Sequence, residues 1–151
     1  MKDLVKKMRF LGYFQAIGSL LGIILVVLNI IDDFITIYTF VSLFVFCFSF
    51  YCGYHLLSEK YESGLKLSLI NQLIQILSFS VFGFSYSYVS GLGLNFIVDV
   101  TQDVILNLQI NITNFKMSFV DQSTHVSVNL VAIIFMNYIF KWQKKLKSIN
   151  N

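Results

Sequence analysis

The segment LNFIVDVTQDVILNLQINITNFKMSFV, residues 94–120, differs from the rest of the chain in the spacing of its apolar residues. Apolar residues take alternate positions from Leu94 to Val100 and again from Val104 to Ile112, with mostly polar residues between them. A period of two is typical of a β-strand that has one apolar face and one polar face. The segment therefore predicts a small β-layer, and the remaining elements are predicted around it.

The β-layer is predicted to be antiparallel, with two to three strands near residues 94–100, 104–112 and 115–120. Polar residues 101–103 predict a turn, and the apolar phase shifts at Thr113 and Asn114. An apolar face of this size is rarely left in contact with water. It is therefore a candidate interaction face, and packing on the helices, on lipid or on another subunit are three open alternatives. Its candidate contact residues are Phe96, Val98, Val104, Leu106, Leu108, Ile110, Phe115, Met117 and Phe119.

The composition indicates a membrane protein. Hydrophobic residues make up 56% of the 151 residues and charged residues 13%, against about 25% charged residues in soluble domains. Four apolar runs predict transmembrane helices at residues 10–31, 34–57, 67–88 and 123–141, with a tight connection at Asp32 and Asp33. The predicted fold is mainly α. It is a single integral-membrane domain, residues 1–151, in which a four-helix transmembrane bundle carries an extracytoplasmic β-layer, residues 94–120, between its third and fourth helices.

The positions of the charges predict the orientation of the chain in the membrane. Ten of the 11 Lys and Arg residues lie in the N-terminal segment, near the 58–66 loop or in the C-terminal tail, and Lys116 is the exception. The positive-inside rule therefore places both termini and this loop in the cytoplasm and the β-layer on the other side. The abundance of Ile, Asn, Lys and Phe is typical of an A/T-rich bacterial genome, so the predicted location is a bacterial cytoplasmic membrane.

Two sets of small or polar residues lie inside the apolar runs. Ser68, Asn71, Gln75 and Ser78 are spaced three, four and three residues apart, so they form one stripe on a predicted helix. The stripe predicts either hydrogen bonds between helices or the lining of a pore, and helix contact is favoured because the stripe holds no charge. Gly18 and Gly22 form a GxxxG motif, a candidate site of close helix packing. Expected partners of the stripe are Asn29, Asn129 and Asn137.

The predicted function follows from the absence of catalytic patterns in the sequence. No arrangement of His, Cys, Asp or Glu resembles a metal site or a nucleophile with its base, and no phosphate-binding or cofactor motif is found. The chain is therefore predicted to be a non-enzymatic, multi-pass membrane protein that acts by contact, as a scaffold, accessory or immunity (protector) subunit, through its β-layer. One alternative is a homo-oligomeric channel lined by the third helix, and another is a lipid-binding membrane protein. Expected partners are membrane lipid and either further copies of the chain or another membrane protein, with neither nucleic acid nor a small-molecule substrate.

Overall fold

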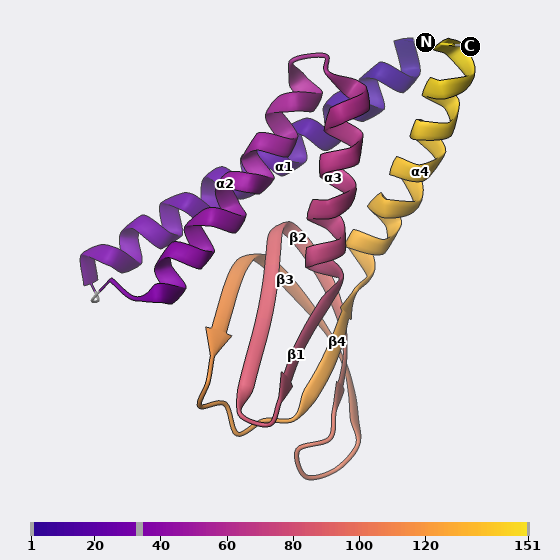
Figure 1. Cartoon of the computed structure of the whole chain (residues 1–151). Coiled ribbons are helices and arrows are strands. Elements are labelled where there is room, and N and C mark those ends of the chain that lie inside the picture. Colours follow the sequence, from indigo (N-terminus) through magenta and orange to yellow (C-terminus); the bar gives the residue numbers. More distant parts are fainter. Residues whose placement is uncertain (1, 33–34, 151) are drawn as a thin grey trace.

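The computed structural model describes residues 2–32 and 35–150, and this part of the chain contains four helices and a four-stranded antiparallel sheet (Figure 1). The helices are α1 (Lys2–Asp32), α2 (Ile37–Leu57), α3 (Tyr61–Ile76) and α4 (Leu130–Asn150). The strands are β1 (Leu77–Val81), β2 (Phe84–Asp99), β3 (Ile105–Ser118) and β4 (His125–Asn129). The predicted connection at Asp32 and Asp33 lies partly outside the described residues, because helix α1 continues to Asp32 and residues 33–34 are not described.

The predicted four-helix transmembrane bundle is wrong. Among the described residues, two helices are long and apolar enough to cross a membrane, one at Lys2–Ile30 and one at Ile37–Leu57. The predicted third span, 67–88, is helical only to Ile76 and continues as strands β1 and β2. The predicted fourth span, 123–141, begins with strand β4, and its helix starts at Leu130 and runs into the Lys-rich tail. The fold is therefore mixed α and β rather than mainly α.

The cause of the error is visible in the sequence of the third apolar run. Residues 77–81, LSFSV, and 84–88, FSYSY, alternate serine with a large apolar or aromatic residue, and Gly83 between them has a φ of +88°. Alternation and a glycine turn are typical of a β-hairpin. The mean hydropathy of the run does not reveal this period, because the apolar and aromatic residues compensate for the low hydropathy of the serines. His125–Asn129 alternates in the same way before α4 begins.

Helices α1 and α2 pack closely through small residues. A Cβ atom added to Gly53 would lie 2.7 Å from the carbonyl oxygen of Gly12 and 2.9 Å from the amide nitrogen of Ala16. Such a gap admits no side chain, so the two helix backbones are in direct contact here. Figure 1 shows both chain termini and the α2–α3 connection at the same end of the molecule.

The sheet is strongly curled because β2 pairs with different strands at its two ends. Its first residues pair with β1, its last residues pair with β4, and β1 and β4 pair with each other. Strand β3 runs beside β2 for nearly its whole length. The β2–β3 ribbon must therefore double back, and Figure 1 shows both of its arms running from an apex near the helices toward the far end of the molecule.

A bulge at the apex allows the ribbon to bend. The β2–β3 register shifts between Val89 and Leu92, opposite Thr113, whose φ is +31°, while Gly91 has a φ of +94°. Extra residues on one strand bend it and increase its twist. The structure thus contains one long strand, β3, where the sequence predicted separate strands at 104–112 and 115–120, and the phase shift noted at Thr113 is this bulge.

Apolar side chains form two core clusters. One lies at the end of the molecule that holds the termini, and it consists of Leu4, Met8, Leu11, Leu56, Leu65, Ile139 and Trp142. The other joins Val26 of α1, Phe46 of α2 and Tyr88 of β2. Along α1 the two clusters are separated by Gln15 and Ser19, which are fully buried. The interior between the apolar clusters is therefore polar.

Candidate functional site

A buried amide network, defined here as Gln15, Ser49, Ser68, Asn71, Gln75 and Ser90, connects α3 to α1, α2 and β2. The Ser68 hydroxyl donates to Gln15 Oε1 at 2.9 Å, and Asn71 Nδ2 donates to Ser49 Oγ at 3.0 Å. Ser49 donates in turn to Ser90 Oγ at 3.0 Å. Each hydrogen bond joins two different elements, so the network fixes α3 against its three neighbours.

The same network holds the backbone of β2. The backbone N–H of Ser90 donates to Gln75 Oε1 at 2.8 Å, just before the bulge at Gly91. The hydroxyl of Tyr88, two residues earlier on the strand, donates to the carbonyl of Val45 at 3.0 Å. Gln75 therefore supplies the acceptor for a backbone group that the bulge removes from the regular sheet ladder.

The structure brings together three members of the predicted stripe, and Ser78 lies apart from them. Ser68, Asn71 and Gln75 are buried on one face of α3, whereas Ser78 belongs to β1, where its carbonyl accepts from Ser127 Oγ at 3.4 Å. Sequence analysis did not identify the partners Gln15, Ser49 and Ser90. Of the expected partners, Asn29 and Asn137 are exposed, and Asn129 accepts from the first backbone amides of α4.

Several buried polar atoms have no protein partner among the described residues. They are Nε2 of Gln15, Gln72 and Gln75, Oγ of Ser85 and Oδ1 of Asn95. An unpaired buried polar group costs about 1–3 kcal/mol. The polar interior is therefore only partly satisfied by the protein, and its members differ in what they contribute to stability.

Gly18 of the predicted GxxxG motif contacts the apex of the sheet. A Cβ atom added to Gly18 would lie 2.6 Å from Gly91 Cα and 2.9 Å from the carbonyl carbon of Ser90. The Thr113 hydroxyl donates to the carbonyl of Gly18 at 3.2 Å and accepts from the N–H of Gly91 at 3.1 Å. The other glycine, Gly22, lies against the ring of Phe46 in α2, where an added Cβ would be 2.6 Å from Cζ. The motif thus packs α1 against α2 and the bulge within one chain.

The sheet presents an apolar outer face. The register places apolar residues opposite one another across all four strands, as in Phe96 with Leu108 and Val128, and Val126 with Phe79 and Val98. We define the apolar sheet face as Leu77, Phe79, Leu92, Leu94, Phe96, Val98, Leu106, Leu108, Ile110, Ile112, Val126 and Val128. Its four β3 residues are 61–69% exposed, so the face is not covered by the helices of its own chain.

The opposite face of the sheet is mostly polar, with Ile97 and Ile105 as exceptions. Ser78 pairs with Ser127, Ser80 pairs with Ser85, and Asn95 pairs with Asn129, and all six side chains are buried within the curl. Asn107, Gln109 and Asn111 continue this face onto β3, outside the curl. The sheet therefore has polar residues inside and apolar residues outside, the reverse of a sheet that covers a soluble core.

The predicted interaction face is divided between the two arms of the ribbon. Phe96, Val98, Leu106, Leu108 and Ile110 belong to the apolar sheet face, and Val104 is exposed in the turn before β3. Beyond the bulge, Phe115 packs beside Tyr88 and Phe119 packs beside Tyr38 of α2. Leu77, Phe79, Val126 and Val128 were not predicted because the sequence placed them in helices.

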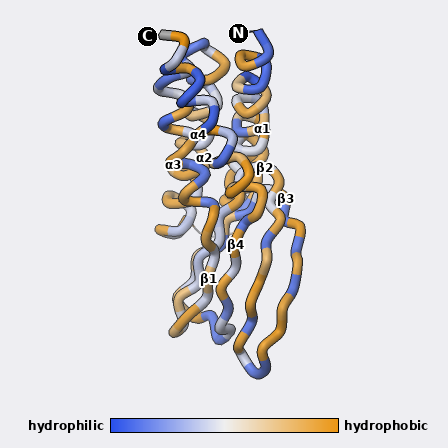
Figure 2. Tube along the Cα trace, turned by 90° about the vertical axis from the view of Figure 1, so that its right-hand side faces the viewer, coloured by the Kyte–Doolittle hydropathy of each residue, from blue (hydrophilic) through white to orange (hydrophobic). Residues whose placement is uncertain are grey.

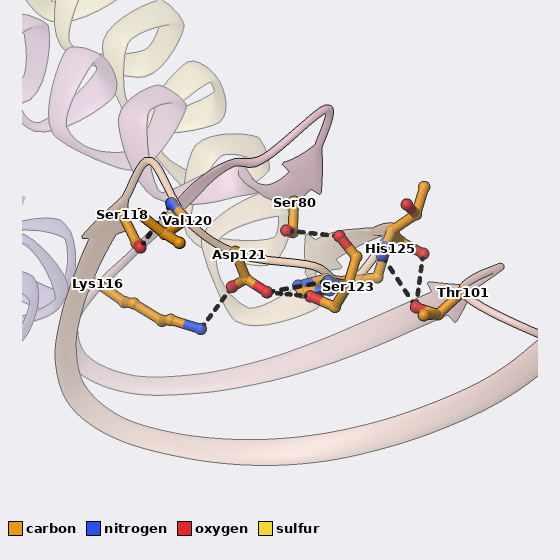
Figure 3. A network of polar contacts seen from close by, with 9 residues as sticks. Ser80, Thr101, Lys116, Ser118, Val120, Asp121, Ser123 and His125 are labelled. Atoms are coloured by element: carbon orange, nitrogen blue, oxygen red, sulfur yellow. Dashed lines mark hydrogen bonds and ion pairs between the residues drawn. The ribbon is translucent and has the colours of Figure 1, made fainter.

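Polar contacts fix the loop between β3 and β4 at the far end of the sheet (Figure 3). Asp121 accepts from Lys116 Nζ at 2.7 Å and from the backbone and hydroxyl of Ser123. The hydrogen bond from Lys116, followed by those from Ser123, holds the pKa of Asp121 well below its usual range. Ser80 donates to the carbonyl of Ser123, and Thr101 accepts from the N–H of Thr124. The loop is thereby tied to β1 and to the β2–β3 turn.

Hydropathy along the chain follows the long axis of the molecule. Figure 2 shows hydrophilic residues at the end that holds both termini, and at the β2–β3 turn and the β3–β4 loop at the other end, with hydrophobic residues predominating between them. Two membrane-length helices and an exposed apolar sheet face occupy this middle region. No protein-family model matches the chain, and no curated protein or solved structure matches it.

Proposed function

We propose that the chain is a small, non-enzymatic membrane protein that acts by contact, as a scaffold, accessory or protector subunit. Helices α1 and α2 anchor it in the membrane, and the apolar sheet face is its recognition surface. The exposure of that face, which carries no charged residue on any of four strands, is the observation on which the proposal rests. An uncharged apolar face of this extent marks an interaction site.

The sheet begins at the depth of the membrane-spanning helices in this proposal. Gly18, which contacts the bulge, lies near the middle of the apolar part of α1. The apex of the β2–β3 ribbon is therefore inside the apolar layer, and the turns of the sheet extend away from the termini. The positive-inside rule places the end with the termini and Lys60 in the cytoplasm, and the composition favours a bacterial cytoplasmic membrane.

This orientation predicts labelling from opposite sides. In a chain with Cys47→Ser and Cys52→Ala, a single cysteine at Gln102→Cys in the β2–β3 turn should react with a membrane-impermeant maleimide added outside intact cells. A single cysteine at Lys60→Cys should react only after the cells are opened. Both parent residues are exposed, so access to the reagent is not limited by the fold. Reaction of both cysteines in intact cells would reject the orientation.

Contact is favoured over the channel alternative by the position of α3. Its polar side chains face α1, α2 and β2 of the same chain, and their hydrogen bonds are internal. A pore between copies of the chain would need these groups to face a neighbouring subunit or water. The network also consists of carboxamides and hydroxyls, which are neutral at physiological pH, so it offers no acid–base pair for catalysis.

A photocrosslinking amino acid at Leu108 tests the proposed function in intact membranes. This side chain points out from the apolar sheet face and is exposed, so the substitution leaves the described packing unchanged. The expected result is a discrete adduct with a protein, identified by mass spectrometry. The same probe at Ile24, exposed on α1, is the control and should give lipid adducts. Lipid adducts alone at Leu108 would reject the contact function in favour of the lipid-binding alternative.

A further inference from the structure

Strand β3 has a free edge. Among the described strands, β1 pairs with β2 and β4, β4 pairs with β1 and β2, and β2 has partners on both sides. Strand β3 pairs with β2 alone. Its second half lies near α1 and α2, but its first half, residues 105–112, is exposed and about 26 Å long at about 3.3 Å per residue.

The free edge lacks the features that protect sheet edges from pairing. Natural edge strands carry charged residues, prolines or bulges that prevent another strand from adding. Residues 104–112 contain no charged residue and no proline, and the bulge lies beyond them at Thr113. The strand therefore presents unpaired backbone groups together with exposed Leu106, Leu108 and Ile110.

Lipid cannot cover this edge, although it can cover the apolar side chains. Hydrocarbon has no hydrogen-bonding groups, and each unpaired backbone group in it costs several kcal/mol. Half of the backbone groups of residues 105–112 point away from β2, because partners alternate along a strand. A strand of protein satisfies these groups and continues the apolar face at the same time.

We propose that the edge pairs with the same edge of a second copy of this chain, in an antiparallel, two-fold arrangement. The inference rests on the proposed contact function and identifies the contact partner. Because the described chain has one such edge, pairing closes after two copies and gives a dimer with one continuous eight-stranded sheet. Open-ended growth needs a second free edge.

The sequence of the edge is self-complementary in this arrangement. Residues that face each other across an antiparallel pair point to the same side of the sheet. With Gln109 on the two-fold axis, Leu106 faces Ile112 of the second copy and Leu108 faces Ile110. The polar side also matches, because Asn107 faces Asn111. Apolar side chains thus face apolar side chains, and amide side chains face amide side chains, across the two copies.

The charges that flank the edge favour the antiparallel direction. Asp103 precedes the uncharged stretch and Lys116 follows it. In the two-fold arrangement the two Asp103 residues lie at opposite ends of the pair, and Lys116 of each copy stays paired with Asp121 of its own chain. A parallel arrangement would place like charges together, which is unfavourable. The edge therefore specifies both its partner and the direction of pairing.

A cysteine scan of residues 105–112 in the Cys47→Ser, Cys52→Ala chain tests the pairing directly in membranes. Facing Cα atoms in an antiparallel pair are about 4.5–5.5 Å apart, within the range of a disulfide. The expected result is a disulfide-linked homodimer that is strongest at one position, with Gln109→Cys the candidate, and at least tenfold weaker two residues to either side. Cysteine at Asn114→Cys, beyond the bulge, is the control and should not crosslink.

Native mass spectrometry from nanodiscs distinguishes the possible outcomes. The unmodified chain should have twice the mass of one copy, and Leu108→Asp should reduce the dimer fraction at least tenfold, while Asn107→Asp on the polar side should reduce it much less. A monomer with no crosslink in the scan would overturn the dimer. If the probe at Leu108 then crosslinks to a different protein, the contact function is supported and the pairing of two copies is rejected. Lipid adducts alone would reject both the contact function and the pairing.

Discussion

Replacing Gly18 by alanine should lower the free energy of unfolding by about 1–3 kcal/mol, the usual cost of inserting a methyl group into a packed interior. Helix propensity alone predicts the opposite sign, since alanine is favoured over glycine by about 1 kcal/mol inside a helix. The clash decides the sign because the added Cβ meets backbone atoms of Ser90 and Gly91, which cannot rotate away. Gly18→Leu should give no folded protein.

The measurement is thermal unfolding of the purified protein in detergent, followed by loss of the monodisperse peak in size-exclusion chromatography. Ile17→Ala, at an exposed neighbouring position of α1, is the matched control and should change the midpoint little. An increase in stability for Gly18→Ala would mean that the bulge does not rest on α1. The depth of the sheet relative to the membrane helices would then need another explanation.

The two membrane-length helices could be predicted from the sequence because their apolar runs carry no competing pattern. Residues 10–31 and 37–57 contain no charges, and the alternate Phe residues at 44–50 have mostly apolar residues between them, so length and hydropathy decide the structure. The turn near Thr101 could be predicted equally well, because it interrupts a clear alternation of apolar and polar residues. Where one signal acts alone, the sequence is sufficient.

The third apolar run carries two signals, hydropathy and alternation. Its hydropathy predicts a membrane helix, but its alternation predicts the strands that form. Leu77–Val81 and the start of β2 alternate serine with aromatic residues, and this period places Ser78, Ser80 and Ser85 inside the curl. A helix over the same residues would place serines on two opposite sides. The alternation was present in the sequence, but a helix and a strand of this hydropathy are distinguished only by period.

The partners in the amide network could not be predicted because they depend on the curl of the sheet. Ser90 reaches Gln75 and Ser49 only because the ribbon doubles back at the bulge and brings β2 against α3. Gln15 is the carboxamide closest to the middle of the first apolar run, which is a usable signal that a polar partner faces it. Nothing in the sequence identifies that partner as Ser68.

Replacing Gln75 by methionine should destabilise the protein, whereas the same change at Gln72 should be neutral or stabilising. Both glutamines lie on α3 and both are 2% exposed. Gln75 Oε1 accepts the buried backbone N–H of Ser90, so its loss leaves that group unpaired at a cost of about 1–3 kcal/mol. Methionine has a similar length and flexibility, so the cavity contribution is small.

The two variants differ in what they remove. Gln75 Nε2 has no partner among the described residues, so removing it offsets part of the loss, and a net destabilisation of about 1–2 kcal/mol is expected. Gln72 Nε2 is also unpaired within the described chain, and methionine there removes a buried polar group without breaking a hydrogen bond. The midpoint of thermal unfolding in detergent should therefore fall for Gln75→Met, and it should stay unchanged or rise for Gln72→Met. Equal losses of stability in the two variants would show that both side chains make stabilising hydrogen bonds. No change in either variant would show that the bulge does not depend on α3.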